Sequence, residues 1–118
     1  MGDEPVEKKK HFRLLPAVKD FLRDQSGDVK QELNGIIWKL ETEGTLSAPY
    51  GEKVSGDDRL FAIRVIQTEN IRVFYVYGIL DNVIGLHGYV KKTEEIPQHE
   101  LDYAKKIVSQ LIAAGVVK

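Results

Sequence analysis

The 118-residue chain contains no cysteine. This absence excludes a disulfide framework, a thiol nucleophile and a zinc site with cysteine ligands. The chain has only 3 histidines, and none shows the H-x-x-x-H or E-x-x-H spacing of a metal-binding helix. We therefore expect neither a metal ion nor a cofactor, so that ordinary side chains must carry the chemistry.

Long hydrophobic runs are also missing. No stretch approaches the roughly 18 to 20 apolar residues that span a bilayer. The first ten residues are rich in Asp, Glu and Lys, contain one Pro, and lack the apolar segment of a secretory signal. We expect a flexible segment over residues 1–10, a single soluble domain over 11–118, and a cytoplasmic protein with no membrane partner.

A large excess of charge of either sign is absent, because 17 Lys and Arg residues are balanced by 18 Asp and Glu residues. A strongly basic composition would have indicated a nucleic-acid-binding protein, and this balance does not. The charges are unevenly distributed, however. Between Arg59 and Lys92 there are five basic and only two acidic residues. A basic patch on a nearly neutral domain is therefore compatible with the sequence.

Hydrophobic periodicity in the first part of the chain predicts a strand followed by two helices. Residues 11–15 form the strand, and Pro16 suits the first turn of a helix, where its missing N–H costs nothing. The second helix begins at Asp28, which makes a capping-box pattern with Gln31, and ends at Gly44. Its apolar residues recur on one helical face: Val29, Leu33, Ile36, Ile37 and Leu40.

The second part of the chain changes to the two-residue period of strands. A Gly-containing loop over residues 44–58 precedes three predicted strands, which are 60–66, 71–77 and 83–90. Short connections make them an antiparallel meander. Pro97 opens a last amphipathic helix that ends near Gly115. The order β-α-α-β-β-β-α predicts an α+β fold with a mainly antiparallel sheet, an N-terminal helical hairpin and a C-terminal helix.

Three short motifs occur in this second part. They are Leu60-Phe61-Ala62-Ile63-Arg64, Arg72-Val73-Phe74-Tyr75, and Leu86-His87-Gly88-Tyr89-Val90-Lys91-Lys92-Thr93 followed by Pro97, Glu100 and Ala104. Together and in this order they resemble the phage-derived HigB-like branch of the RelE/ParE toxin superfamily. The resemblance extends from Leu60 to the last helix, while the preceding helical hairpin has the expected length but no distinctive residues.

The resemblance implies a RelE-like fold and the toxin component of a bacterial type II toxin–antitoxin system. It further implies a metal-independent, ribosome-dependent mRNA endoribonuclease (an mRNA interferase) that inhibits translation. The implied partners are a cognate antitoxin, of the helix-turn-helix type, together with the ribosome and mRNA. In such a reaction the ribose 2′-OH attacks the adjacent phosphate, which requires cations, a base and an acid.

The resemblance places Arg64, Arg72 and Lys92 in the catalytic site and Lys91 in the substrate-binding site. The planar guanidinium of Arg donates paired hydrogen bonds to phosphate oxygens. Strand alternation puts Arg72 and Phe74 on one face of their strand. Without the resemblance, a solvated arginine or an ion pair with Glu69 or Asp81 would be the preferred interpretation.

The base and the acid are not assigned by these motifs. His87 and Tyr89 lie with Lys91 on one face of their strand and belong to the predicted substrate-binding set. For His87, a structural role with a backbone carbonyl as partner is favoured over catalysis. His99, in the first turn of the last helix, is included among the catalytic residues, with Tyr103 one turn further on as the other choice.

Two alternative functions remain open from the sequence. Relatives in the ParE branch poison DNA gyrase by binding it, without enzymatic activity, and the nearly neutral charge balance is compatible with that branch. The Arg-Val-Phe-Tyr and Lys-Lys-Thr motifs favour the nuclease branch instead. An inactive member that retains only the fold and antitoxin binding is the third interpretation.

Overall fold

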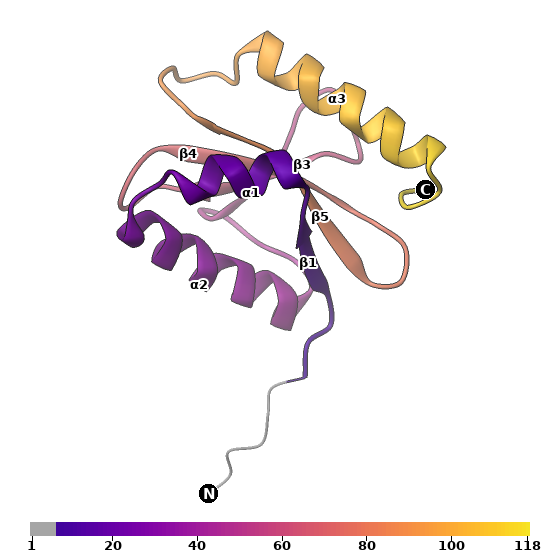
Figure 1. The fold of residues 1–118 in the computed structure, drawn as a ribbon, viewed down its shortest axis with the longest axis horizontal. Coiled ribbons are helices and arrows are strands. Elements are labelled where there is room, and N and C mark those ends of the chain that lie inside the picture. The colour runs from indigo at the N-terminus through magenta and orange to yellow at the C-terminus, as the bar shows by residue number, and fades with distance from the viewer. Residues whose placement is uncertain (1–6) are drawn as a thin grey trace, which may run out of the picture.

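The computed structural model describes residues 7–118. Its elements are β1 (His11–Leu14), α1 (Pro16–Arg23), α2 (Gly27–Glu43), β2 (Gly51–Lys53), β3 (Phe61–Val65), β4 (Ile71–Tyr77), β5 (Asn82–Val90) and α3 (Gln98–Ala113) (Figure 1). One five-stranded sheet has the order β1-β5-β4-β3-β2. β1 is parallel to β5, and the other neighbours are antiparallel. The predicted α+β class and the β3–β4–β5 meander are confirmed.

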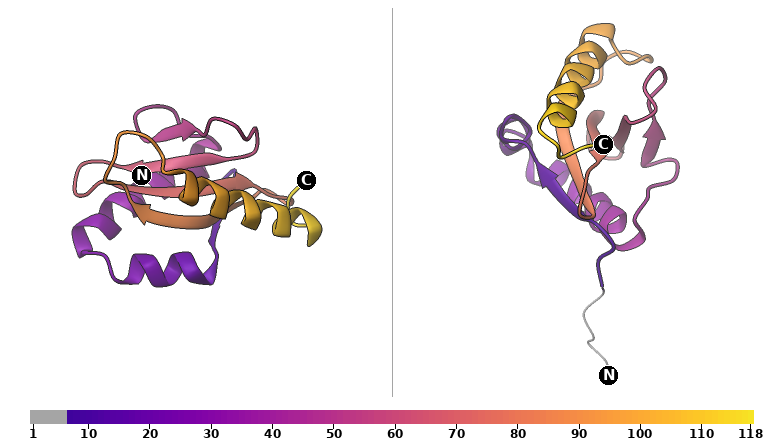
Figure 2. Two further views of the ribbon diagram at one scale, coloured as in Figure 1. Left: turned by 90° about the horizontal axis from the view of Figure 1, so that it is seen from above. Right: turned by 90° about the vertical axis from the view of Figure 1, so that its right-hand side faces the viewer.

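The sheet separates two hydrophobic cores. Val73 and Tyr75 of the central strand β4 pack in the core under α1 and α2, whereas Phe74 and Val76 pack in the core under α3. This division follows from the two-residue period of a strand, which sends successive side chains to opposite faces. Figure 1 and Figure 2 show α3 apart from the α1–α2 pair, with the sheet between them. β4 is therefore buried on both faces.

One strand was missed by the sequence prediction. β2 lies within the segment 44–58 that we expected to be a loop, and it forms the edge of the sheet beside β3. A strand of three residues is too short to show a period, and the segment that contains it holds Gly, Pro and several polar residues. The observed order is therefore β-α-α-β-β-β-β-α. The new strand matters because it carries Glu52, opposite Ala62 of β3.

The ends of α2 explain its length. Ser26, and not the predicted Asp28, is the N-cap residue, and its hydroxyl accepts a hydrogen bond of 3.2 Å from the N–H of Val29. Asp28 instead lies in the first turn, where its negative charge suits the helix dipole. Gly44 ends the helix in the left-handed conformation, at φ 85°, as predicted.

The chain that precedes β1 contacts the end of α2. The N–H groups of Lys9 and Lys10 both donate to the carbonyl of Glu41, and the Lys8 ammonium lies 3.0 Å from the Glu41 carboxylate. Residues 8–10, which belong to the segment expected to be flexible over 1–10, thus contact α2. The rest of that segment, residues 1–6, lies outside the described residues. Within residues 7–118, no helix has the length and apolarity required to cross a membrane.

A β-bulge in β5 determines which side chains face α3. Phe74 pairs with His87, but the next residue, Tyr75, pairs with Gly85, so that Leu86 is one extra residue in β5. Leu86 packs in the core under α3, and His87 contacts the first turn of the same helix. The bulge thereby directs two successive side chains toward α3.

Candidate functional site

The strand register brings three of the predicted site residues into one row. Arg64 of β3 stands opposite Arg72 of β4, and Arg72 stands opposite Tyr89 of β5. Directly opposed residues of neighbouring strands share a face of the sheet. Tyr89 packs in the core under α3, so the row lies on the α3 face. The predicted faces of β4 and β5 therefore coincide.

Arg72 is enclosed at this face, with only 2% of its surface exposed. Its Nε lies 3.3 Å from Oε1 of Glu52, and its Nη1 donates to Oδ1 of Asn70 at 3.0 Å and to the carbonyl of Ile71. Burial lowers the pKa of Arg72, the nearby Arg64 lowers it further, and the Glu52 carboxylate opposes both effects. A guanidinium remains charged even so. We call Glu52, Arg64, Arg72 and Tyr89 the Arg72 cluster.

Glu52 is a residue of this candidate site that the sequence prediction missed. The partners considered for the arginines were Glu69 and Asp81, but Asp81 forms an ion pair with Lys10 at the other end of the sheet. Glu52 comes from the unpredicted strand β2 and reaches Arg72 on the far side of β3. A carboxylate in a Gly-containing segment gives no sequence signal of this contact, because only the register of three strands creates it.

The Arg72 cluster holds unpaired polar atoms. Within residues 7–118, the buried side-chain nitrogen and oxygen atoms without a hydrogen-bond partner are Glu52 Oε1, Arg64 Nε, Arg72 Nε and Tyr89 Oη. All four belong to this cluster. At 3.3 Å, Arg72 and Glu52 form an ion pair without hydrogen-bond geometry, and Arg64 donates only through Nη1, to the carbonyl of Pro49 at 3.1 Å.

Tyr89 contributes a hydroxyl that stays protonated at neutral pH. Burial raises its pKa to about 12, and the carboxylates of Glu100 and Glu52 add to the increase, while Arg72 opposes it. The phenol is consequently a hydrogen-bond donor in this site, not a phenolate.

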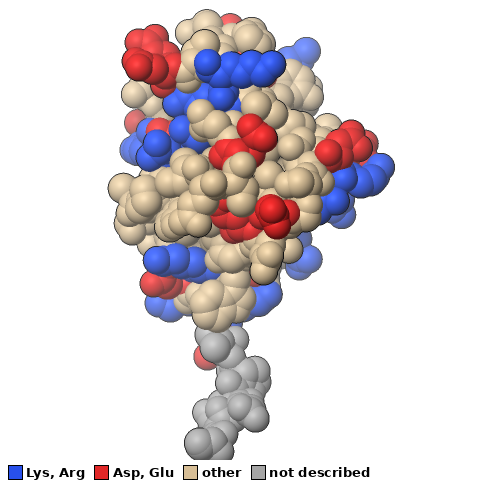
Figure 3. All heavy atoms as spheres, turned by 90° about the vertical axis from the view of Figure 1, so that its left-hand side faces the viewer, with Lys and Arg blue, Asp and Glu red and all other residues tan. Residues whose placement is uncertain are grey.

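Lys91 lies beside the Arg72 cluster. Its N–H donates to the carbonyl of Asn70 at 2.7 Å, which anchors the chain just after β5. A groove of about 390 Å³ separates β2 from the segment after β5, and both Glu52 and Lys91 line it, together with Lys53, Glu94 and Glu95. Lys92 follows as an exposed residue. Figure 3 shows one face of the molecule, on which Lys and Arg atoms lie at both ends and at one side, with acidic atoms among them.

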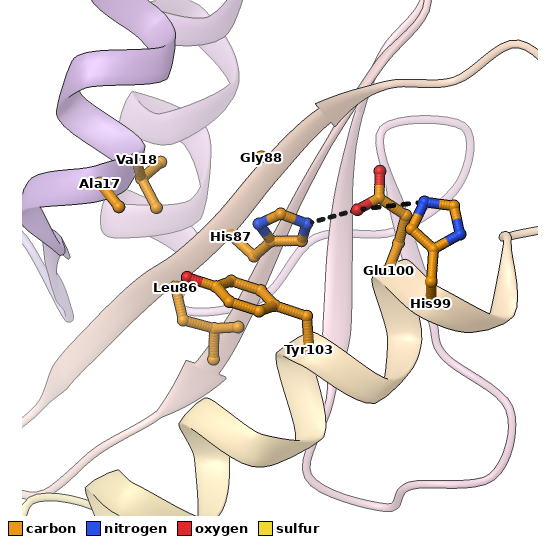
Figure 4. A pocket seen from close by; sticks show the side chains of 8 residues that line it. All are labelled: Ala17, Val18, Leu86, His87, Gly88, His99, Glu100 and Tyr103. Atoms are coloured by element: carbon orange, nitrogen blue, oxygen red, sulfur yellow. Dashed lines mark hydrogen bonds and ion pairs between the residues drawn. The ribbon is translucent and has the colours of Figure 1, made fainter.

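His87 and His99 lie apart from the Arg72 cluster, at a cavity between α1 and α3. His87 Nε2 is 2.9 Å from Oε1 of Glu100, and His99 Nε2 is 3.9 Å from the same oxygen (Figure 4). The partner of His87 is thus a carboxylate and not the backbone carbonyl that we expected. The surrounding cavity, of about 390 Å³, is lined by Ala17, Val18, Leu86, His87, Gly88, His99, Glu100 and Tyr103. We call it the His87 pocket.

The two places are neighbours along β5. The rings of His87 and Tyr89 are stacked, with centroids 5.9 Å apart and planes at 19°, and the Tyr103 ring lies 4.7 Å from His87. Tyr89 therefore belongs to the Arg72 cluster and also supports the wall of the His87 pocket. His99 is 80% exposed and contacts Glu100, so the structure does not place it among the arginines.

The described residues contain no group of three His, Cys, Asp or Glu side chains that forms a metal-binding site. The Arg72 cluster itself presents side chains of three chemical kinds. It offers a carboxylate as proton acceptor, a phenol as donor, and guanidinium groups for an anion.

Comparison with known proteins agrees with this architecture. Residues 20–109 match the family described as Phage derived protein Gp49-like. The chain belongs to this family. The resemblance to the phage-derived, HigB-like branch of the RelE superfamily is thereby confirmed.

The fold is also found among solved structures. A chain of the crystal structure of the RelB–RelE antitoxin–toxin complex from Methanococcus jannaschii superposes with a TM-score of 0.55 at 17% sequence identity. The match covers 72% of the present chain and 99% of that chain, and it shows a RelE-like fold for this Gp49-like protein. No curated protein matches the chain.

Proposed function

We propose that this Gp49-like protein is the toxin of a bacterial type II toxin–antitoxin pair and an endoribonuclease that cleaves mRNA on the ribosome. Its family and its RelE-like fold, which it shares with a chain of an antitoxin–toxin complex, support the first part. A cognate antitoxin is its protein partner in the cytoplasm. The Arg72 cluster supports the second part.

The unpaired polar atoms of the Arg72 cluster carry this proposal. A buried polar group without a partner costs roughly 1 to 3 kcal/mol, and native proteins hold only a few such groups per 100 residues. Here four such atoms, from Glu52, Arg64, Arg72 and Tyr89, occur together. Their combination of cationic donors, a neutral donor and an anionic acceptor matches the needs of a ribose–phosphate unit. Arg72 Nε and Glu52 Oε1 lie 3.3 Å apart as an ion pair, so Arg64 and Tyr89 are the groups left for RNA to pair with.

The cluster suits cleavage by the neighbouring 2′-OH group. Glu52 accepts the proton of the 2′-OH, whose oxygen forms a bond to phosphorus as the bond from phosphorus to the 5′-oxygen breaks. The products are a 2′,3′-cyclic phosphate and a 5′-OH end. Arg64 and Lys91 stabilise the charge on the phosphate oxygens. Tyr89, which stays protonated, is the donor available to the leaving oxygen.

Arg72 acts through Glu52 in this proposal. With 2% of its surface exposed it lies beneath the other groups, and its charge holds the Glu52 carboxylate in place at 3.3 Å. Arg72 is therefore a positioning residue, whereas Arg64 and Lys91 contact the phosphate. The ribosome aligns the message, which compensates for the small number of catalytic groups.

A cell-free translation reaction with purified protein tests the proposal, with message ends mapped by primer extension. We expect new 5′ ends in the presence of translating ribosomes, none on ribosome-free RNA, and their loss with Glu52→Gln and Arg64→Ala. Arg23→Ala is the matched control, because Arg23 is exposed and pairs only with Asp20 on α1. Intact messages at saturating protein would overturn the nuclease proposal, and inhibition of gyrase supercoiling would then support the ParE-like alternative.

A further inference from the structure

The hydrogen bond to Glu100 fixes the orientation and the tautomer of His87. A carboxylate can only accept, so His87 Nε2, 2.9 Å from Glu100 Oε1, is the donor. When Nε2 carries the proton of a neutral imidazole, Nδ1 presents a lone pair. Figure 4 shows this second nitrogen directed away from Glu100, toward the side of the cavity bordered by α1. Among the described residues, no hydrogen bond involves His87 Nδ1.

The remaining walls of the His87 pocket are aromatic and apolar. The Tyr103 ring, with 45% of the residue exposed, lies across the cavity from Ala17 and Val18 of α1 (Figure 4). His99 adds a second exposed ring at the mouth. A volume of about 390 Å³ falls within the range of roughly 300 to 1,000 Å³ for small-ligand sites. A flat aromatic ligand fits these walls.

We propose that the His87 pocket binds a nucleobase whose edge carries an exocyclic amino group. His87 Nδ1 accepts a hydrogen bond from that amino group, and the Tyr103 ring stacks against the face of the base. The negative charge of Glu100 disfavours a phosphate in the same place. This inference rests on the proposed function, because it adds base recognition to an RNA-cleaving site.

The position of the pocket beside the Arg72 cluster supports a base of the same RNA. His87 and Tyr89 are two residues apart on β5, which corresponds to roughly 6.6 Å along a strand. Their stacked rings separate the His87 pocket from Arg72, which stands opposite Tyr89. A phosphate at Arg64 and a base at Tyr103 are therefore close enough to belong to one nucleotide or to adjacent ones.

Nuclear magnetic resonance of the imidazole nitrogens tests this proposal without ribosomes. The full-length protein has only 3 histidines, so the His87 signals can be assigned by comparison with His87→Gln and His11→Gln. We expect His87 to carry its proton on Nε2. Added guanosine, adenosine or cytidine shifts the Nδ1 signal, whereas uridine, which lacks an amino group, binds more weakly.

Variants separate binding in the pocket from nonspecific contact. Tyr103→Leu removes the stacking ring and weakens guanosine binding roughly tenfold, in line with the loss of one base–aromatic contact. Glu100→Ala removes the acceptor of His87 Nε2–H, frees the imidazole and abolishes the Nδ1 shift. The control His11→Gln, on β1, binds guanosine as the unchanged protein does. Equal binding by all of these variants would overturn the proposal.

The nucleoside-binding experiment can fail or succeed independently of the nuclease assay. A nucleoside-induced shift in a protein that leaves messages intact would overturn the proposed nuclease but retain the pocket. Ribosome-dependent cleavage without any nucleoside-induced shift would overturn the pocket alone. A shift caused by N-acetylarginine amide, but by no nucleoside, would also overturn it and would identify an arginine side chain of a protein partner as the occupant.

Discussion

Arg72 Nε and Glu52 Oε1 lie 3.3 Å apart, and this ion pair joins the central strand β4 to the edge strand β2 across β3. The Arg72 side chain is 3% exposed, whereas the Glu52 side chain is 34% exposed. One partner is therefore fixed within the protein, and the other remains accessible from the groove. This asymmetry suits a positioning role for Arg72 and a proton-accepting role for Glu52.

The first prediction concerns the two partners of this pair. We expect Glu52→Gln to lower kcat by roughly 10² to 10⁴, as the loss of a general base does. Arg72→Met should lower kcat as well, by about tenfold or more, with KM nearly unchanged, because Arg72 orients Glu52 and does not bind RNA. Single-turnover cleavage on programmed ribosomes measures both parameters.

Arg23→Met is the control for this experiment, because it removes an exposed arginine from α1. Circular dichroism should show that Arg72→Met is folded, since methionine fills much of the buried volume. A higher KM with unchanged kcat in Arg72→Met would contradict the positioning role and would indicate direct contact between Arg72 and the phosphate.

The second prediction concerns the lysines that follow β5. Lys91 lines the groove beside Glu52, and Lys92 is exposed next to it. Each of these lysines is expected to neutralise one phosphate. Lys91→Ala and Lys92→Ala should then each reduce the steepness of the plot of log binding constant against log salt concentration by about 0.7, the value per phosphate for a single strand. Fluorescence anisotropy with a labelled oligonucleotide at several salt concentrations measures the slope. Lys39→Ala, on the exposed face of α2, should leave it unchanged.

Much of the fold follows from local sequence patterns. β3, β4 and β5 are rich in β-branched and aromatic residues, and α2 has both an apolar face and a terminating glycine, so these elements are recognisable without the structure. Alternation also placed Arg72 correctly with Phe74. The pairing of Arg72 with Tyr89 could not be predicted from alternation, because a bulge shifts the β4–β5 register by one residue between Phe74 and Tyr75.

The contacts of Glu52 with Arg72 and of Glu100 with His87 could not be predicted from the sequence, and the reason differs from that for the strand register. Each joins elements whose relative placement depends on packing of the whole domain. Glu52 reaches Arg72 across a strand, and Glu100 of α3 meets His87 of β5 because α3 docks on that face. The sequence motifs indicated the arginines and histidines, and the long-range partners became visible only in three dimensions.

The third prediction concerns Glu32, which connects α2 to the turn between β3 and β4. Its carboxylate accepts hydrogen bonds from the N–H groups of Ile66, Gln67 and Thr68 and from the Thr68 hydroxyl, at 2.8 to 3.1 Å. We expect Glu32→Gln to lower the free energy of unfolding by about 1 to 2 kcal/mol at pH 7, because hydrogen bonds to a charged acceptor are lost. Urea denaturation measures this difference, with the exposed Glu43→Gln as control.

The pH dependence of this effect has a definite sign. Burial alone would raise the pKa of Glu32, but the hydrogen bonds from residues 66–68 outweigh burial and lower it. A lowered pKa in the folded state contributes stability above the ordinary glutamate value, near 4.5, and loses it as the pH falls through the folded-state pKa. The difference between the unchanged protein and Glu32→Gln should therefore be full at pH 7 and shrink below pH 4.5. A constant difference across this range would contradict the role of the charge.

The fourth prediction uses two glycines to separate stability from positioning of Glu52. A Cβ at Gly51, next to Glu52, would lie 2.7 Å from the carbonyl oxygen of Leu46 and 2.5 Å from its Cβ, whereas a Cβ at Gly35 on α2 would meet nothing within 4 Å. We expect Gly51→Ala to lower the free energy of unfolding by about 1 to 3 kcal/mol through overpacking. Gly35→Ala should raise it by roughly 0.5 to 1 kcal/mol, because alanine favours a helix. Urea denaturation followed by circular dichroism gives both values.

A double variant that combines Gly35→Ala with Gly51→Ala separates the effect of Gly51→Ala on stability from its effect on the position of Glu52. The sites are on different elements, and their free-energy changes should add, so that Gly35→Ala restores part of the lost stability. If β2 must hold Glu52 against Arg72, cleavage in the double variant stays as low as in Gly51→Ala despite the recovered stability. Recovery of cleavage in proportion to the folded fraction would instead show that Gly51 serves stability alone, and that the position of β2 tolerates the displacement.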